Sequence, residues 1–250
     1  YNIYSLAANT TYTVKLVRNC TQFAPGSDYA LSDPVYVTFT TLCDPMTITA
    51  TEYFEEGFNG YTGSTDYTYN STNGIVPDCW TAYTEGTIKP HITKSVSYLW
   101  HHGDDPNTLY FYGASSTNSY LALPVFSNDF SELQVSFWMQ TEGSSGTLTL
   151  GYITSEDVNF NTYQVLDTYE NHSNSTIDMV QRITYLAFKD IPSSATRLVF
   201  RWAHPESSWH GCCIDDVVVK LAPSCYPMGT LSSGELGSTS ANLSWTLVDP

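Results

Sequence analysis

The sequence has little positive charge. Its 250 residues include only 9 Lys and Arg against 25 Asp and Glu, which gives a formal net charge of −16. Nucleic acids and anionic membrane surfaces are bound through clustered Lys and Arg side chains, so this balance argues against both as partners. We interpret the acidic excess as a source of solubility in an extracellular setting.

Other absences narrow the function further. No apolar run approaches the roughly 18 residues of a membrane helix. The sequence has no Cys-x-x-Cys or His-x-x-x-His pair, so it does not predict a zinc site. It also lacks a Gly-x-Ser-x-Gly motif. His101 and His102 stand near Asp104 and Asp105. Because such loop residues are mostly solvated, we expect no enzymatic activity.

The dominant pattern is the two-residue period of half-buried strands. Every second residue of 133–139 is apolar, and residues 147–152 and 197–202 repeat the pattern. Even residues 177–188, the most helix-like stretch, alternate as a strand does. Clusters of Gly, Ser, Pro and Asp separate these segments. The sequence therefore predicts an all-β protein with a central β-sandwich or jelly roll.

The two ends of the sequence carry short motifs at residues 6–14, 34–41 and 238–245. With these motifs, residues 1–43 resemble the last two strands of a fibronectin type III domain, which is an immunoglobulin-like β-sandwich. Tyr12 matches its tyrosine corner, whose hydroxyl bonds to the upstream backbone. Residues 222–250 resemble its first two strands, with Trp245 as the core tryptophan. Joined with the C-terminal part first, they would lack only the middle of one domain. We therefore expect a segment of a longer protein that alternates two modules, with any export signal outside it.

The centre carries short motifs in a fixed order, at residues 54–58, 76–81, 107–113, 120–126, 133–138 and 214–217. In this order and at these spacings they resemble the cleaved-adhesin and MAM-like jelly rolls of secreted Bacteroidota surface proteins. The resemblance covers about residues 47–220, and we place the domain at 44–221. It implies a secreted or surface-exposed module.

The resemblance also implies a structural calcium ion. In related jelly rolls, the opening Phe-Glu-x-Gly strand and the closing Ile-Asp-Asp-Val strand lie side by side and calcium joins them. Glu55, Asp215 and Asp216 match the ligands of that ion. Three carboxylates buried together without a cation would be unfavourable. The alternative is that these acids are the solvated ends of edge strands.

Aromatic and polar residues gather around Trp100 and Trp209. Because many jelly rolls bind sugars through exposed aromatic platforms, Trp100, His101 and Trp209 are the candidate ligand-binding residues. Trp202 belongs to an alternating strand and is expected in the core. Trp209 has the alternative of packing beneath the closing strand.

Six cysteines in a chain rich in Ser, Thr, Asn and Tyr fit an oxidising compartment and structural disulfides. Adjacent Cys212 and Cys213 point to opposite sides of a strand. We expect one of them, Cys213 in our assignment, to pair with Cys79. The fibronectin resemblance implies a second disulfide between Cys20 and Cys43. The pairing of the remaining cysteines stays open.

These observations predict a non-catalytic module of a secreted or cell-surface bacterial protein with many repeats, acting as an adhesin or a fibre repeat. Its expected partners are neighbouring repeats or chains, through the edges of the β-sandwich, and host or microbial glycans or proteins. The alternative is a carbohydrate-binding accessory module of a secreted glycan-degrading enzyme or protease. A third possibility is a purely structural repeat whose half-domains are completed by its neighbours.

Overall fold

A computed structural model describes residues 2–18, 31–61, 75–94, 100–112, 116–143, 145–155, 159–171, 179–204, 210–225 and 228–247. In these ranges the regular structure consists of fifteen strands and two short 3-10 helices. The chain divides into two compact units, Tyr1–Asp44 and Pro45–Pro250. The fold class is all-β, as the alternating sequence pattern predicts.

The first unit contains an antiparallel hairpin of β1 (Thr11–Leu16) and β2 (Val35–Thr40). The Tyr12 hydroxyl accepts a hydrogen bond of 2.8 Å from the backbone N–H of Ala7. The Tyr12 ring lies 6.0 Å from the ring of Phe39 on the partner strand. The bond to the upstream backbone that we expected of Tyr12 is therefore present.

A second hairpin, of β14 (Met228–Leu236) and β15 (Ala241–Leu247), lies near the C-terminus. Trp245, the expected core tryptophan, is 58% exposed in it. A two-stranded ribbon leaves both of its faces open, so it cannot bury such a side chain by itself. The fibronectin type III resemblance of the two ends stays a prediction.

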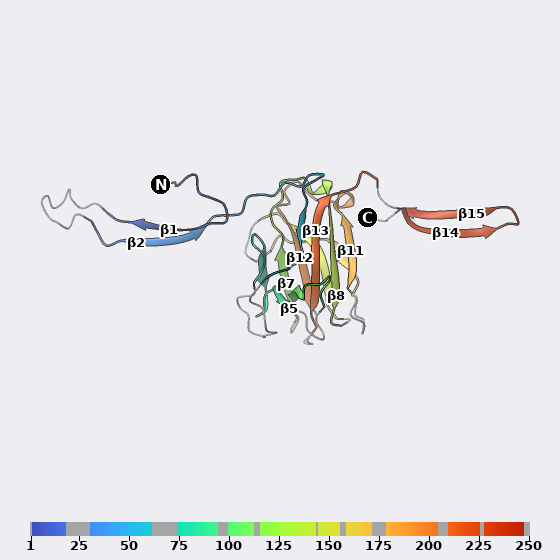
Figure 1. The fold of residues 1–250 in the computed structure, drawn as a ribbon, viewed down its shortest axis with the longest axis horizontal. Coiled ribbons are helices and arrows are strands. Elements are labelled where there is room, and N and C mark those ends of the chain that lie inside the picture. Colours follow the sequence, from blue (N-terminus) through green and yellow to red (C-terminus); the bar gives the residue numbers. More distant parts are fainter. Residues whose placement is uncertain are drawn as a thin grey trace. The chain divides into compact units, whose positions relative to one another are not determined.

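The chain segment that follows the first hairpin and precedes the second forms a sandwich of two antiparallel sheets (Figure 1). The five-stranded sheet has the order β10 (Gln164–Tyr169), β9 (Thr147–Ile153), β12 (Arg197–His204), β7 (Thr117–Ala122) and β4 (Thr81–Thr84). The six-stranded sheet has the order β11 (Val180–Tyr185), β8 (Leu133–Thr141), β13 (Cys212–Leu221), β6 (Asn107–Phe111) and β5 (His91–Lys94), and β3 (Phe54–Glu56) also pairs with β13. The 3-10 helices are η1 (Phe130–Glu132) and η2 (Leu186–Phe188).

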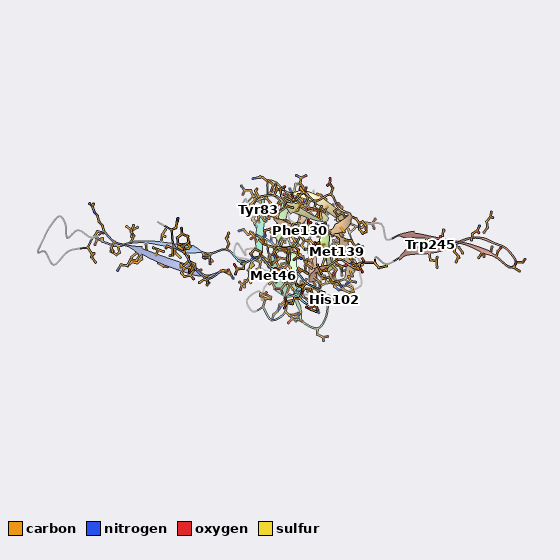
Figure 2. The ribbon with its side chains drawn as sticks, turned by 90° about the horizontal axis from the view of Figure 1, so that it is seen from above. Met46, Tyr83, His102, Phe130, Met139 and Trp245 are labelled. Carbon is orange, nitrogen blue, oxygen red and sulfur yellow. The ribbon has the colours of Figure 1, made fainter. Side chains whose placement is uncertain are left out.

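The main core lies between the two sheets. Phe137 of β8 meets Phe200 of β12 edge to face, with ring centroids 4.8 Å apart. Trp202 and Met139 are fully buried in the same cluster, and Met139 lies within the sandwich in Figure 2. The core position predicted for Trp202 is confirmed. The strand predicted within residues 177–188 is confirmed as β11 over Val180–Tyr185, whereas Leu186–Phe188 form η2.

Arg197, at the start of β12, is a buried cation that connects neighbouring segments. Its guanidinium donates hydrogen bonds to the carbonyl oxygens of Leu123, Ala122 and Cys79, and to the hydroxyl of Thr81. The contacts join residues that are 74 to 118 positions apart in sequence. A buried charge is stable only when it is hydrogen-bonded, so these bonds are retained in the folded protein. They fix the edge strand β4 and its neighbour β7 against β12.

The disulfide of the described residues joins Cys43 to Cys79. This pairing overturns both predicted disulfides. Cys43 is not free for Cys20, which itself lies outside the described residues, and Cys79 is not bonded to Cys213. A disulfide at residue 43 still agrees with an oxidising compartment.

Cys212 and Cys213 are both fully buried thiols on opposite faces of β13. Cys212 belongs to the core between the sheets, whereas Cys213 belongs to a separate cluster that includes Trp100. The opposite orientation was expected from the strand period. Cys213 needs no disulfide to be buried, because the segment that carries Trp100 covers it.

Candidate functional site

The candidate site lies on the outer face of the six-stranded sheet. Here a small hydrophobic cluster forms outside the main core, and it is centred on the buried side chains of Tyr110, Met179 and Cys213. Three half-buried aromatic rings pack against it, those of Trp100, Tyr112 and Trp138. We call these three residues, together with His102, the outer aromatic surface.

His102 lies towards the periphery of the sandwich (Figure 2). It connects the loop that follows Trp100 to the six-stranded sheet. Its imidazole stacks on Trp138, with ring centroids 3.8 Å apart and an angle of 11° between the planes. Its Nδ1 lies 2.5 Å from Oδ2 of Asp216, and its backbone N–H donates to Oδ2 of Asp215 at 2.8 Å. The loop is therefore held by stacking on β8 and by two acidic residues of β13.

Asp215 is fully buried beneath this loop. Its Oδ1 accepts the backbone N–H of Asp216 at 2.8 Å, and its Oδ2 accepts that of His102. Burial raises the pKa of Asp215 to about 7; these two hydrogen bonds favour the charged form, while the charges of Asp216 and Asp105 oppose it. Asp215 is therefore a carboxyl group that titrates near neutral pH.

Asp216 sits at an irregularity in β13. Its φ of 45° is in the left-handed region, and the register with β8 shifts between Asp215 and Val218. A Cβ atom on Gly57 would lie 2.8 Å from Oδ1 of Asp216. The glycine of the opening motif therefore leaves room for a carboxylate of the closing motif.

The opening and closing strands pair as the family resemblance implies, with Glu55 opposite Val218. Glu55 is exposed, however, whereas Asp215 is fully buried. No group of three or more His, Cys, Asp or Glu side chains in the described ranges is arranged to hold a metal ion. Calcium also takes backbone carbonyl and water oxygens, so the calcium site that the resemblance implies at Glu55, Asp215 and Asp216 stays a prediction.

Glu56, the neighbour of Glu55, accepts hydrogen bonds from the segment that follows β3. Its carboxylate accepts the backbone N–H of Phe58 at 2.7 Å and the hydroxyl of Tyr61 at 2.9 Å. Burial and the neighbouring Glu56 raise the pKa of Tyr61 to about 12. Glu56 thereby supports the left-handed turn at Phe58, whose φ is 55°.

The predicted ligand-binding residues have different outcomes. Trp100 lies in the outer aromatic surface. His101 is half-buried beside it, and its Nδ1 is buried without a hydrogen-bond partner. Trp209 lies outside the described residues. Trp138 was missed, although its sequence carries a signal: it is an aromatic residue on the polar side of the alternation of 133–139.

No family model matches the chain, and no curated protein matches it. Among solved structures, the chain is similar to the K2 cleaved adhesin domain of Lys-gingipain, with 14% identity over 69% of this chain and 100% of that chain and a TM-score of 0.48. It is also similar to the K1 cleaved adhesin domain of Lys-gingipain from Porphyromonas gingivalis W83, with 16% identity over 69% and 99% and a TM-score of 0.45.

A third similar structure is the C-terminal family 22 carbohydrate-binding module of Clostridium thermocellum Xyn10B. The identity is 18% over 74% of this chain and 100% of that chain, and the TM-score is 0.41. These three similarities are distant, so the description of the fold rests on the strand pairing given above.

Proposed function

We propose that this chain is a non-catalytic adhesion or binding module whose ligand surface is the outer aromatic surface. The observation that carries the proposal is the placement of two tryptophans and a tyrosine, all half-buried, over one face of a sheet. Aromatic rings that pack on a buried cluster on one side and are partly accessible to solvent supply a large contact area. Ordering them on binding costs little side-chain entropy. One face of Trp138 is occupied by His102, so the proposal assigns the main ligand contact to Trp100.

The chemistry of the neighbouring polar groups supports binding rather than catalysis. Both carboxylate oxygens of Asp215 accept backbone N–H groups, and Asp216 is paired with His102. Burial raises the pKa of the Cys213 thiol, which keeps it protonated and unreactive. These side chains are engaged in holding the surface together.

The adhesin proposal and its alternative, a carbohydrate-binding accessory module, differ in the class of ligand that they bind. An adhesin would bind a protein or glycan of another cell, whereas a carbohydrate-binding accessory module would bind the polymer that its parent enzyme degrades. Similar structures include adhesin domains and a carbohydrate-binding module. The function of each of these structures belongs to that protein, so the proposal rests on the residues of this chain.

A secreted or cell-surface location is part of the proposal. The disulfide of Cys43 with Cys79 and the net charge of −16 support it. No helix within the described ranges is long and apolar enough to cross a membrane. Neighbouring repeats are the proposed partners of the end hairpins, because large apolar side chains of both hairpins are exposed, among them Val37 at 60% and Trp245 at 58%.

Binding of the chain to arrays of immobilised glycans and of cell-surface proteins tests the proposal. Replacing the Trp100 ring by a methyl group in Trp100→Ala should weaken the strongest array hit by at least about tenfold, because a central aromatic contact contributes roughly 1.4 kcal/mol or more. Glycan hits alone would favour the carbohydrate-binding alternative.

Tyr83→Ala is the matched control. Tyr83 is a half-buried ring of the five-stranded sheet, where it packs against Tyr120 and Phe160. This variant should bind as the unchanged chain does. If Trp100→Ala folds normally and loses no more binding than Tyr83→Ala, the ligand surface lies elsewhere.

A further inference from the structure

Carboxyl groups lie on both sides of Trp100 along β13. The Trp100 ring packs against the cluster that contains Cys213, and its backbone N–H is hydrogen-bonded to the Cys213 sulfur. Two positions before Cys213, the backbone N–H of Gly211 donates to Oε2 of Glu142 at 2.6 Å. Two positions after it stands the buried carboxyl group of Asp215. Each position is roughly 7 Å from Cys213 along the strand, which is within the Debye length of about 8 Å at physiological ionic strength.

The charges that act on this part of the sheet are negative. Burial raises the pKa of the Cys213 thiol, and the charges of Glu142 and Asp215 raise it further. The charges of Asp216 and Asp105 oppose the ionisation of Asp215 in the same way. These shifts show that the carboxylates repel one another. A cation that binds over this surface relieves their repulsion.

Glu142 has neutral hydrogen-bond partners. Its Oε2 accepts the Tyr110 hydroxyl at 2.9 Å as well as the Gly211 N–H. Burial raises the pKa of Glu142, whereas these two bonds and the charge of His210 lower it. Within the described residues, Glu142 forms no ion pair with a Lys or Arg side chain. The chain has only 9 Lys and Arg against 25 Asp and Glu, so cations for such carboxylates are scarce in the chain itself.

We propose that the outer aromatic surface binds the Arg or Lys side chains of a basic protein segment. This inference rests on the proposed function, because it names the ligand class of the same surface. A guanidinium or ammonium group is attracted to the face of an indole ring, and Arg makes this contact more often than Lys. The carboxylates around Trp100 add to the attraction and favour a cation over a neutral group.

The same charges disfavour the other ligand classes. A sialylated or sulfated glycan carries negative charge, so the carboxylates near Trp100 repel it. A neutral glycan stacks on an aromatic ring but leaves the repulsion among Glu142, Asp215 and Asp216 unchanged. A protein segment with several Arg or Lys side chains uses both the rings and the negative charge of this surface.

The test uses the full chain and three synthetic peptides of four dipeptide repeats each: Gly-Arg, Gly-Gln and Gly-Glu. Binding is measured by calorimetry at about pH 8, which favours the ionised form of Glu142. EDTA in the buffer keeps calcium from neutralising the carboxylates. At about 0.01 M salt we expect the Gly-Arg peptide to bind with a Kd on the order of 100 μM, at least about tenfold more tightly than the Gly-Gln peptide. The Gly-Glu peptide should bind most weakly.

Salt and two substitutions locate the attraction. Raising the salt concentration to about 0.15 M should weaken binding of the Gly-Arg peptide at least about threefold, because screening shortens the reach of the carboxylates. Trp100→Ala should weaken it by about threefold to thirtyfold, as expected for the loss of a cation–π contact. Glu142→Gln removes one charge but keeps an acceptor for the Tyr110 hydroxyl, and it should weaken binding by about twofold to fivefold.

Glu85→Gln is the matched control for Glu142→Gln. Glu85 is an exposed residue beside the five-stranded sheet, and its carboxylate accepts a hydrogen bond of 2.8 Å from the side chain of Asn118. The two substitutions change the net charge equally, yet Glu85→Gln should leave the affinity for the Gly-Arg peptide unchanged within about 1.5-fold. Equal losses in both variants would show that the net charge of the chain attracts the peptide, and they would overturn the inference.

Other outcomes separate this inference from the proposed function. Absence of saturable binding by the Gly-Arg peptide, or equal binding of the Gly-Gln peptide, would overturn the inference alone. The proposed function would still stand if an array ligand lost affinity in Trp100→Ala and its binding did not depend on salt. Gly-Arg binding that persists undiminished in Trp100→Ala, with normal folding by circular dichroism, would place the cation elsewhere and would overturn the inference as well.

Discussion

At the scale of single residues, buried polar groups determine how this protein responds to its environment. Asp215 has its pKa raised from 3.8 to about 7 by burial. At pH values between about 4 and 7, Asp215 of the folded chain therefore retains a proton that it releases in the unfolded chain. The resulting stabilisation is present at low pH and is lost as the pH rises through about 7, at roughly 1.4 kcal/mol for each unit of pKa difference.

Asp215→Asn removes this titration. We expect the free energy of unfolding of the unchanged chain, minus that of the variant, to decrease between about pH 4 and pH 7 and then to level off. Urea denaturation at a series of pH values measures it. A difference that does not change with pH would show that Asp215 does not titrate in this range.

Asp129→Asn provides a control of opposite sign. Hydrogen bonds from the backbone and hydroxyl of Ser131 lower the pKa of the exposed Asp129. Its stabilising contribution is therefore present at neutral pH and disappears as the pH falls below about 4. The stability difference from the unchanged chain should therefore change between about pH 4 and pH 7 in Asp215→Asn, and below about pH 4 in Asp129→Asn.

At the scale of strands, the alternating pattern predicts the core well. It places Phe137 and Trp202 inside and gives β11 as a strand, because a two-residue period fixes which side chains share a face. It does not reveal what covers the opposite face. The contact of His102 with Asp215 spans 113 positions and depends on an irregular loop, which leaves no periodic signal. The alternation indicates that Trp138 faces outward, but it does not indicate that His102 stacks on it.

Arg197 provides a test of how the edge of the five-stranded sheet is held. Arg197→Met retains much of the side-chain volume but leaves the carbonyl oxygens of Leu123, Ala122 and Cys79 without its guanidinium. We expect a loss of about 3–5 kcal/mol in the free energy of unfolding, measured by urea denaturation. Lys220→Met, at an exposed position of β13, should change it by less than about 0.5 kcal/mol. Equal effects of the two substitutions would contradict the structural role of Arg197.

At the scale of the whole chain, the sequence predicts the kind of elements present but not their covalent linkage. The predicted disulfide of Cys79 with Cys213 assumed that Cys213 needs a disulfide partner. Instead, Cys213 is a buried free thiol in the cluster against which Trp100 packs. A disulfide depends on which residues meet in space, and six cysteines allow many pairings. The hairpin of Tyr12 was predictable, because its hydroxyl contact is local in sequence.

The end hairpins should be the least stable elements when the chain stands alone. We expect backbone amides of β14 and β15 to exchange with deuterium far faster than those of β8, because an isolated hairpin is marginally stable in water. In a tandem duplicate of the sequence, exchange in the hairpins that adjoin the junction should slow if neighbouring repeats are their partners. Unchanged exchange in the duplicate would contradict that proposal.

The central claim is that the outer aromatic surface binds the ligand of this module. Calorimetric titration of the strongest array ligand into the unchanged chain, Trp100→Ala and Tyr83→Ala tests it most directly. The account predicts a loss of affinity of at least about tenfold in Trp100→Ala alone, with folding verified by circular dichroism. Equal affinities of the three proteins would contradict the claim.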